Sequence, residues 1–181
     1  MKTKSSAFVI FIPGFPKDES DSTCLPAHQS FLLTLKESYP LLRIIVISFQ
    51  YPFEAKTYKW NKVEVTSFGG KNRGGLSRLL LWNRVRRHFK SLQNEYRIKG
   101  LLSFWLGETA LVGSSRAKKY SIAHFCWMMG QDARSNNKYV SRISPAPFEL
   151  IAISDFVASE MEKSHQLRPR HIIPFGIDPK I

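Results

Sequence analysis

The chain alternates short apolar runs with longer amphipathic stretches, and this alternation limits its fold more than any other feature. Runs such as FVIFI (8–12) and IIVI (44–47) carry β-branched and aromatic residues without interruption, which is typical of parallel strands covered on both faces by helices. The stretches between them place apolar residues three and four positions apart, as amphipathic helices do. The pattern predicts an α/β fold, a Rossmann-like doubly wound parallel sheet with helices on both faces. Strands are predicted at 7–12, 43–49, 63–68, 100–105, 121–125, 150–154 and 171–174, and helices at 25–38, 76–96, 108–118 and 155–166.

Length and composition narrow the class of protein. The 181 residues are 43% hydrophobic and 13% aromatic, which is enough to fill one sizeable core and excludes a disordered chain. We expect one domain over residues 1–175. Cys24 and Cys126 show no CxxC or Cys/His spacing, so we expect neither a disulfide scaffold nor a metal site. The compartment that we expect for the protein is the reducing cytoplasm. The apolar run at 7–12 is too short to span a membrane, and we interpret it as a strand and not as a signal peptide.

The positive charge is concentrated in one segment. The chain has 27 Lys and Arg against 14 Asp and Glu, a net charge of +13, and residues 71–99 hold nine of the basic residues with Glu95 as their only acid. The helix predicted at 76–96 would present one apolar face, made of Leu76, Leu79 or Leu80, Val85, Phe89, Leu92 and Tyr96. We expect it to contact an anionic membrane surface or an anionic acceptor through Arg78, Trp82, Arg84, Arg86, Arg87 and Lys90, with Trp82 as the interfacial anchor.

Two other interpretations of this helix stay open. It can be a core-covering helix whose outer face is merely solvated and basic. It can also bind nucleic acid, whose phosphates attract the same side chains; we place nucleic acid behind lipid because the segment combines its charge with an apolar stripe and Trp82.

Polar residues follow several predicted strands, where α/β proteins build their sites. GxGxxG and GxxxxGK[ST] are both absent, which argues against a dinucleotide site and a P-loop. Gly14, after the first strand, either lets the backbone approach a ligand or serves only the turn. Glu108 either binds a sugar hydroxyl or favours the helix dipole.

The segment MGQDAR (129–134) follows the fifth strand and places a carboxylate and a guanidinium in one short loop. Asp132 would orient a substrate hydroxyl and Arg134 would meet an anion. The alternative is an exposed ion pair that contributes little to stability, and we expect replacement of Asp132 to leave folding intact. Ser154 or Asp155 is the predicted cap of the last helix. The five histidines show no spacing typical of a metal site or a hydrolase triad, and His28, His88 and His124 are expected to be structural or surface residues.

The C-terminal third resembles a known enzyme family. LIAIS (150–154), a helix, and then RHIIPFGIDP (170–179) are similar in order and spacing to the end of the N-terminal domain in family 4 GT-B glycosyltransferases. Phe15-Pro16 with Pro26 and Gln29 resembles that family's first loop and helix. Gly130-Gln131-Asp132 stands where the family often has His-Gly-x-Asp. The resemblance covers nearly the whole chain.

The resemblance implies a retaining enzyme that transfers a sugar from a nucleotide-sugar donor to a glycan, glycolipid or other envelope acceptor, without a required metal or other cofactor. Gly14, Gly130, Asp132 and Ser154 would face the cleft, with Asp132 catalytic, and position adds Glu108 and Arg134 as substrate-binding residues. The interdomain linker would begin at 176, and the donor domain would follow Ile181. We therefore expect the chain by itself to be inactive, cytoplasmic and peripheral on the inner face of the membrane.

Two residues depart from the family pattern. Met129 stands where a histidine near the reacting sugar is usual, and a thioether cannot supply the same hydrogen bond. Phe175 replaces the asparagine of the linker. The alternative function is a non-catalytic α/β module that binds an anionic glycan, nucleic acid or a protein partner.

Overall fold

The computed structural model describes residues 4–176, which form two compact units, residues 4–100 and Leu101–Phe175. Both units are built mainly from parallel strands with helices packed on them, and the one antiparallel pair described is β3–β4 in the first unit. The α/β fold class predicted from the sequence is therefore confirmed. Of the linker expected at 176–181, only Gly176 falls among the described residues.

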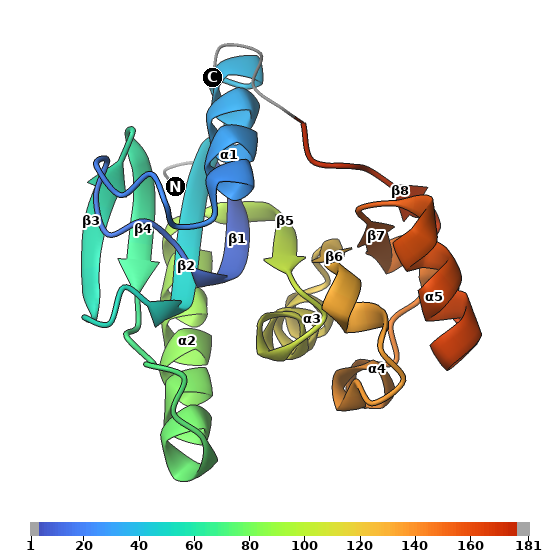
Figure 1. Ribbon diagram of the computed structural model, residues 1–181. Helices are drawn as coiled ribbons and strands as arrows, with labels where there is room; N and C mark the ends of the chain where they lie inside the picture. Colours follow the sequence, from blue (N-terminus) through green and yellow to red (C-terminus); the bar gives the residue numbers. More distant parts are fainter. Residues whose placement is uncertain (1–3, 177–181) are drawn as a thin grey trace. The chain divides into compact units, whose positions relative to one another are not determined.

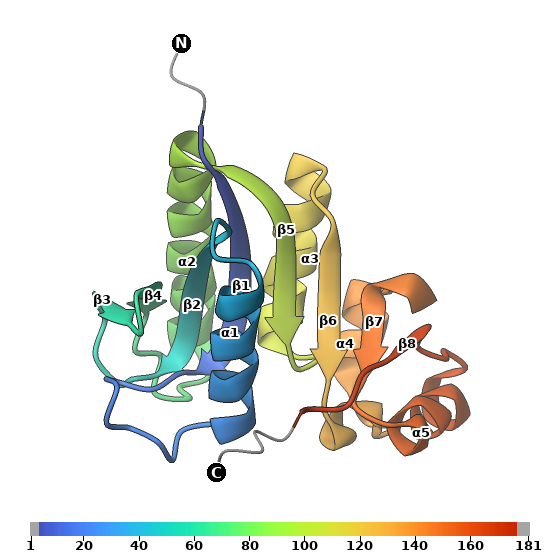
Figure 2. The same ribbon diagram turned by 90° about the horizontal axis from the view of Figure 1, so that it is seen from above.

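The first unit has a sheet in the strand order β3-β4-β2-β1, with β3 antiparallel to β4 at the edge. The other pairs are parallel, with Ala7 opposite Arg43 and Ile45 opposite Glu64. Helices α1 and α2 lie on opposite faces of this sheet (Figure 1 and Figure 2). The elements are β1 (Ser6–Gly14), α1 (Pro26–Ser38), β2 (Arg43–Tyr51), β3 (Lys56–Trp60), β4 (Val63–Ser67) and α2 (Gly75–Glu95).

The predicted apolar strands form the core of this unit. The side chain of Phe11 in β1 is fully buried, with its ring centroid 5.4 Å from that of Phe49 in β2 and 5.7 Å from that of Phe89 in α2. The ring of Phe15 packs edge-on against that of Trp60, at 5.0 Å. Tilted and edge-to-face contacts of this kind are preferred between aromatic rings, and here they join β1 to β2 and to α2.

The second unit has parallel strands in the order β5-β6-β7-β8. One buried cluster joins Cys126 and Met128 of β6 to Ala110 of α3, Ile143 of α4 and Met161 of α5. The three helices therefore pack on the same face of these strands. The elements are β5 (Arg97–Phe104), which begins in the first unit, α3 (Glu108–Tyr120), β6 (His124–Met128), η1 (Gly130–Ala133), α4 (Lys138–Ile143), η2 (Pro147–Glu149), β7 (Leu150–Ala152), α5 (Asp155–His165) and β8 (His171–Ile172).

Some element boundaries differ from the prediction. The strand predicted at 121–125 begins at His124, because α3 continues to Tyr120 and Ser121 ends it in the left-handed conformation, at φ 54°. Strand β3 was not predicted, since its sequence KTYKW is half polar and lies at the edge of the sheet. Among residues 4–176, no helix combines the length and the apolar character needed to cross a membrane.

Candidate functional site

Five of the predicted site residues follow adjacent parallel strands of the second unit. Glu108 begins α3 after β5, Gly130 and Asp132 lie in η1 after β6, Arg134 follows η1, and Ser154 follows β7. The carboxyl ends of neighbouring parallel strands share one edge of a sheet, which is where α/β proteins bind ligands. The structure therefore brings these five residues to one edge.

Asp132 is a buried carboxylate that joins two loops. Its side chain is 5% exposed, and its Oδ2 accepts hydrogen bonds from the backbone N–H groups of Leu106, at 2.9 Å, and Met129, at 2.8 Å. Burial raises the pKa of Asp132 to about 6, although both N–H donors favour the ionised form. The expectation of an exposed loop carboxylate, or of a surface ion pair with Arg134, is wrong because the carboxylate turns inward to these two N–H groups.

Asn137 completes this connection. Its Nδ2 donates to the backbone oxygens of Leu106, at 3.0 Å, and Asp132, at 2.9 Å. The loop after β5 and the turn after β6 are thus joined through both side chains. Asn137 was not predicted as a site residue, because a lone asparagine in a polar loop carries no pattern.

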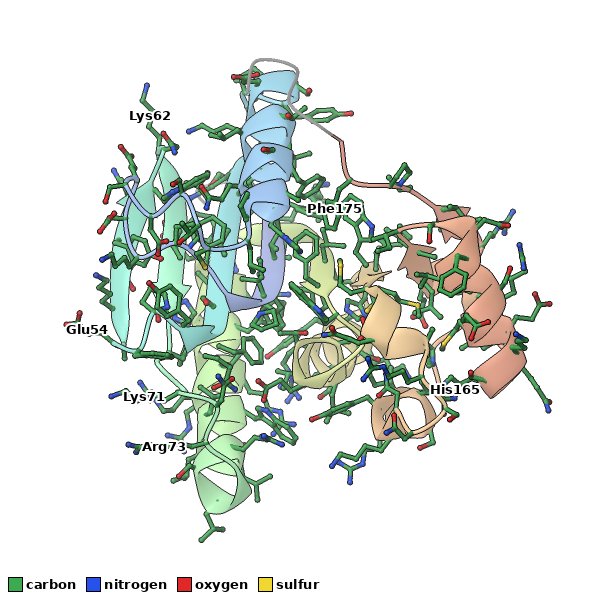
Figure 3. All side chains as sticks on the ribbon, viewed as in Figure 1. Glu54, Lys62, Lys71, Arg73, His165 and Phe175 are labelled. Carbon is green, nitrogen blue, oxygen red and sulfur yellow. The ribbon has the colours of Figure 1, made fainter. Side chains whose placement is uncertain are left out.

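A groove lies between η1 and α5. It encloses about 530 Å³. We call it the η1–α5 groove. The hydrogen bond between Nε2 of His165, at the end of α5 (Figure 3), and the backbone oxygen of Arg134, at 2.9 Å, joins its two walls. One wall consists of Gly130, Ala133, Arg134, Ser135 and Asn136, and the other of Phe156, Glu160 and Ser164.

The groove combines a flat apolar ring with hydrogen-bond donors and acceptors. The ring of Phe156 is exposed although it is large and apolar, with 72% of its surface accessible. Arg134 offers a fork of N–H donors, Glu160 offers acceptors, and Asn136 offers both. A concave site with an aromatic surface and a few convergent polar groups is suited to a small polar ligand.

Phe156 and Glu160 were not predicted as site residues. Phe156 and Val157 are adjacent apolar residues of the helix predicted at 155–166, and adjacency alone does not say which of them faces the core. In the structure only Val157, Ala158 and Met161 of α5 are buried. The four-residue spacing of Val157 and Met161 could have predicted this exposure, because it leaves Phe156 on another side of the helix.

The local structure around Ser154, Glu108 and Gly130 can be explained by the fold alone. Ser154 is the N-cap of α5, as predicted, and its hydroxyl accepts from the N–H of Val157 at 3.2 Å. Glu108 is an acidic residue in the first turn of α3, where a negative charge stabilises the helix dipole. A Cβ at Gly130 would meet no atom within 4 Å, so this glycine is not required for close packing of the protein itself.

Gly14 lies in the first unit, at the end of β1. A Cβ there would lie 3.4 Å from Cβ of Tyr51, and the N–H of the next residue, Phe15, donates to the backbone oxygen of Tyr51 at 3.1 Å. These contacts support the interpretation of Gly14 as a residue of the turn.

Helix α2 buries Val85, Phe89 and Leu92 of the predicted apolar face, with Tyr96 buried at its C-cap, but its first turns differ from the prediction. Trp82 is 8% exposed and packs inward with Leu81, Val85, Phe89 and Leu92, so the expectation of an interfacial Trp82 is wrong. Leu76, Leu79 and Leu80 are exposed instead. Four-residue steps from Leu81 through Val85 to Phe89 form the buried stripe. The three leucines belong to the N-terminal turns of α2, which extend past the strands of the first unit (Figure 1).

The basic residues of α2 fall into two sets. Arg78 and Arg86 are half-buried, whereas Arg84, Arg87 and Lys90 are exposed. The outer face of α2 therefore keeps three of the five cations that were predicted to contact an anionic partner.

Across residues 4–176, the structure contains no group of three or more His, Cys, Asp or Glu side chains arranged to hold a metal ion. No family model matches the sequence, and no curated protein matches it either.

Proposed function

We propose that this chain is the acceptor-binding domain of a retaining glycosyltransferase, which transfers a sugar from a nucleotide-sugar donor to a glycan, glycolipid or other envelope acceptor. The observation that carries the proposal is the η1–α5 groove, which combines the exposed ring of Phe156 with Arg134, Asn136 and Glu160. The resemblance of residues 150–154 and 170–179 to family 4 GT-B enzymes supports it. The donor would be held mainly by a second domain.

Each residue of the groove has a role in this proposal. Phe156 stacks against the apolar face of a sugar ring, Glu160 and Asn136 bind hydroxyl groups, and Arg134 pairs with a negative charge on the acceptor. Asp132 is a positioning residue, because its carboxylate is bonded to Leu106 and Met129 beneath the groove. Under this proposal the domain works in the cytoplasm, at the inner face of the membrane.

A glycan-binding titration tests the acceptor role. Neutral and anionic oligosaccharides are titrated into the ¹⁵N-labelled chain, and we expect saturable shifts of the amide signals of Gly130 and Arg134. Phe156→Ala should weaken this binding about tenfold, the order expected for loss of one stacked ring. Phe148→Ala is the matched control, because Phe148 is also exposed but lies in η2, outside the groove. Unchanged binding by Phe156→Ala, or no saturable binding of any sugar, would contradict the proposal.

Met129 favours a second candidate, the non-catalytic glycan-binding module. It is buried after β6 at the position where the family usually has a histidine. A transfer assay with labelled nucleotide sugars and a groove-binding glycan, using the complete gene product, separates the two candidates. Transfer supports the enzyme. Binding of the glycan at Phe156 without transfer supports the module.

A further inference from the structure

The first turns of α2 expose three leucines on one side. Leu76, Leu79 and Leu80 are 79%, 50% and 64% exposed, and residues three and four positions apart are neighbours on a helix surface. We call these three residues the leucine tip. A contiguous apolar patch on an otherwise polar surface marks a site of contact with a protein or a membrane.

Helix α2 cannot turn the leucine tip toward the sheet, because other side chains already occupy its buried side. Leu81, Trp82, Val85 and Phe89 already occupy the inward side of α2. Rotating the helix to cover the leucine tip would expose these four side chains. The exposure of the tip is therefore a stable property of the packed helix.

Positive charge surrounds the leucine tip. Residues 65–94 contain seven Lys and Arg and no Asp or Glu. Lys71 and Arg73 lie in the loop that leads into α2, and both side chains point outward (Figure 3). Farther along the helix, Arg84, Arg87 and Lys90 are exposed, with the guanidinium of Arg84 also lying 5.4 Å from the ring centroid of Phe68.

We propose that the leucine tip inserts into an anionic lipid bilayer and docks the protein there. The leucines would enter the boundary between headgroups and acyl chains, and the surrounding cations would pair with lipid phosphates and carboxylates. Nucleic acid would satisfy the cations but leave the leucines in water. The interaction uses α2 and the loop before it, and it does not depend on the proposed glycosyltransferase activity.

Vesicle flotation tests the proposal. The chain is mixed with vesicles of phosphatidylcholine alone or with 30% phosphatidylserine, and the floated fraction is measured from low to high salt. We expect binding to the anionic vesicles to be at least tenfold stronger and to weaken as salt is raised. The triple substitution Leu76→Ser, Leu79→Ser and Leu80→Ser should reduce that binding at least tenfold.

Two matched controls separate the leucine tip from general surface effects. Leu41→Ser removes another leucine of the first unit, 99% exposed, and should leave flotation unchanged. Arg84→Gln with Arg87→Gln should weaken binding and reduce its salt dependence, whereas Lys118→Gln with Lys119→Gln, at the end of α3, should not. Circular dichroism checks that each variant is folded.

The proposal would be overturned if the triple variant floated like the wild type, or if the wild type bound equally to both kinds of vesicle. It would also be overturned if the wild type were a dimer in gel filtration, the triple variant were a monomer, and neither the wild type nor the triple variant floated. Glycan binding at Phe156 should be unchanged in the triple variant, because the groove lies in the other unit. Loss of vesicle binding and failure of the proposed acceptor role are thus measured separately.

Discussion

Asp132 connects two loops beneath the η1–α5 groove through a single oxygen. The backbone N–H groups of Leu106 and Met129 both end on Oδ2. Buried N–H groups without an acceptor are costly, because each has lost its bond to water. The stability of this part of the fold therefore depends on Asp132, although an aspartate after a parallel strand is also a residue expected to act on a substrate.

Replacing Asp132 should destabilise the protein, contrary to what an exposed position would imply. Asp132→Ala leaves two buried N–H groups without their acceptor, each worth roughly 1–3 kcal/mol, so we expect the free energy of unfolding to fall by about 2–6 kcal/mol. Asp132→Asn keeps an oxygen at that place and should cost less than half as much. Urea denaturation followed by circular dichroism measures the free energy of unfolding of both variants. Equal losses in Asp132→Ala and Asp132→Asn would show that the oxygen shared by the two N–H groups does not stabilise the fold.

Gly113 allows α3 to approach the sheet at a buried polar pair. A Cβ there would lie 2.5 Å from Oγ of Ser103 and 2.9 Å from Nε2 of His124, and these two atoms are themselves hydrogen-bonded at 2.9 Å. We predict that Gly113→Ala lowers the free energy of unfolding by about 1–3 kcal/mol, as overpacking does, despite the better helix propensity of alanine.

Gly130→Ala is the control, because the added methyl group would meet no atom within 4 Å. It should change stability by less than about 0.5 kcal/mol. Urea midpoints of the two variants give the comparison. A stable Gly113→Ala protein would mean that α3 can move away from the Ser103–His124 pair at little cost.

The segment after β8 is held to the sheet by stacked rings. The ring centroids of Trp127 and Phe175 are 4.9 Å apart with a 19° angle between planes, and those of Trp127 and Phe104 are 5.6 Å apart. Nε1 of Trp127 also donates to the backbone oxygen of Ile173 at 3.1 Å. Phe175, which departs from the family pattern, thus has a packing role here.

Removing the outer ring of this stack should be visible in tryptophan emission. Phe175→Ala uncovers one side of Trp127, so we expect a red shift of the emission maximum and a stability loss of about 1–3 kcal/mol, from the lost apolar area and the ring contact. Phe148→Ala removes an exposed phenylalanine and should change neither quantity. An unshifted emission maximum in Phe175→Ala would contradict the importance of the stack.

At the scale of the whole molecule, the sequence predicted more of the fold than of the site. The strands and all four long helices were predictable, since an uninterrupted apolar run and a period of 3.6 residues are both local properties of the sequence. The buried state of Asp132 was not predictable, because it depends on N–H groups of Leu106 and Met129 that only the packed loops bring together. Trp82 and Leu80 are adjacent in the chain, and only the position of α2 on the sheet decides which is buried.

Two buried histidines make the stability of the chain depend on pH. Burial lowers the pKa of His28, in the first unit, and of His124, in the second, to about 4, with a smaller contribution to His124 from the charge of Lys118. The unfolded pKa of histidine is about 6.5. Between these values the unfolded chain binds protons that the folded chain does not, so stability falls as the pH drops from about 6.5 to 4.

Asp132 acts in the opposite direction over part of that range. Its pKa is raised to about 6 in the folded protein, so between about 3.9 and 6 the folded state holds a proton that the unfolded state has released, and stability falls as the pH rises. His28, His124 and Asp132 alone give a net loss of about 1.4 kcal/mol per pH unit on acidification between pH 6 and 4.5. Burial also lowers the pKa of His88, which adds to this loss. Urea denaturation at a series of pH values should show the slope. His28→Leu should reduce it, and an unchanged slope in that variant would mean that His28 does not titrate on unfolding.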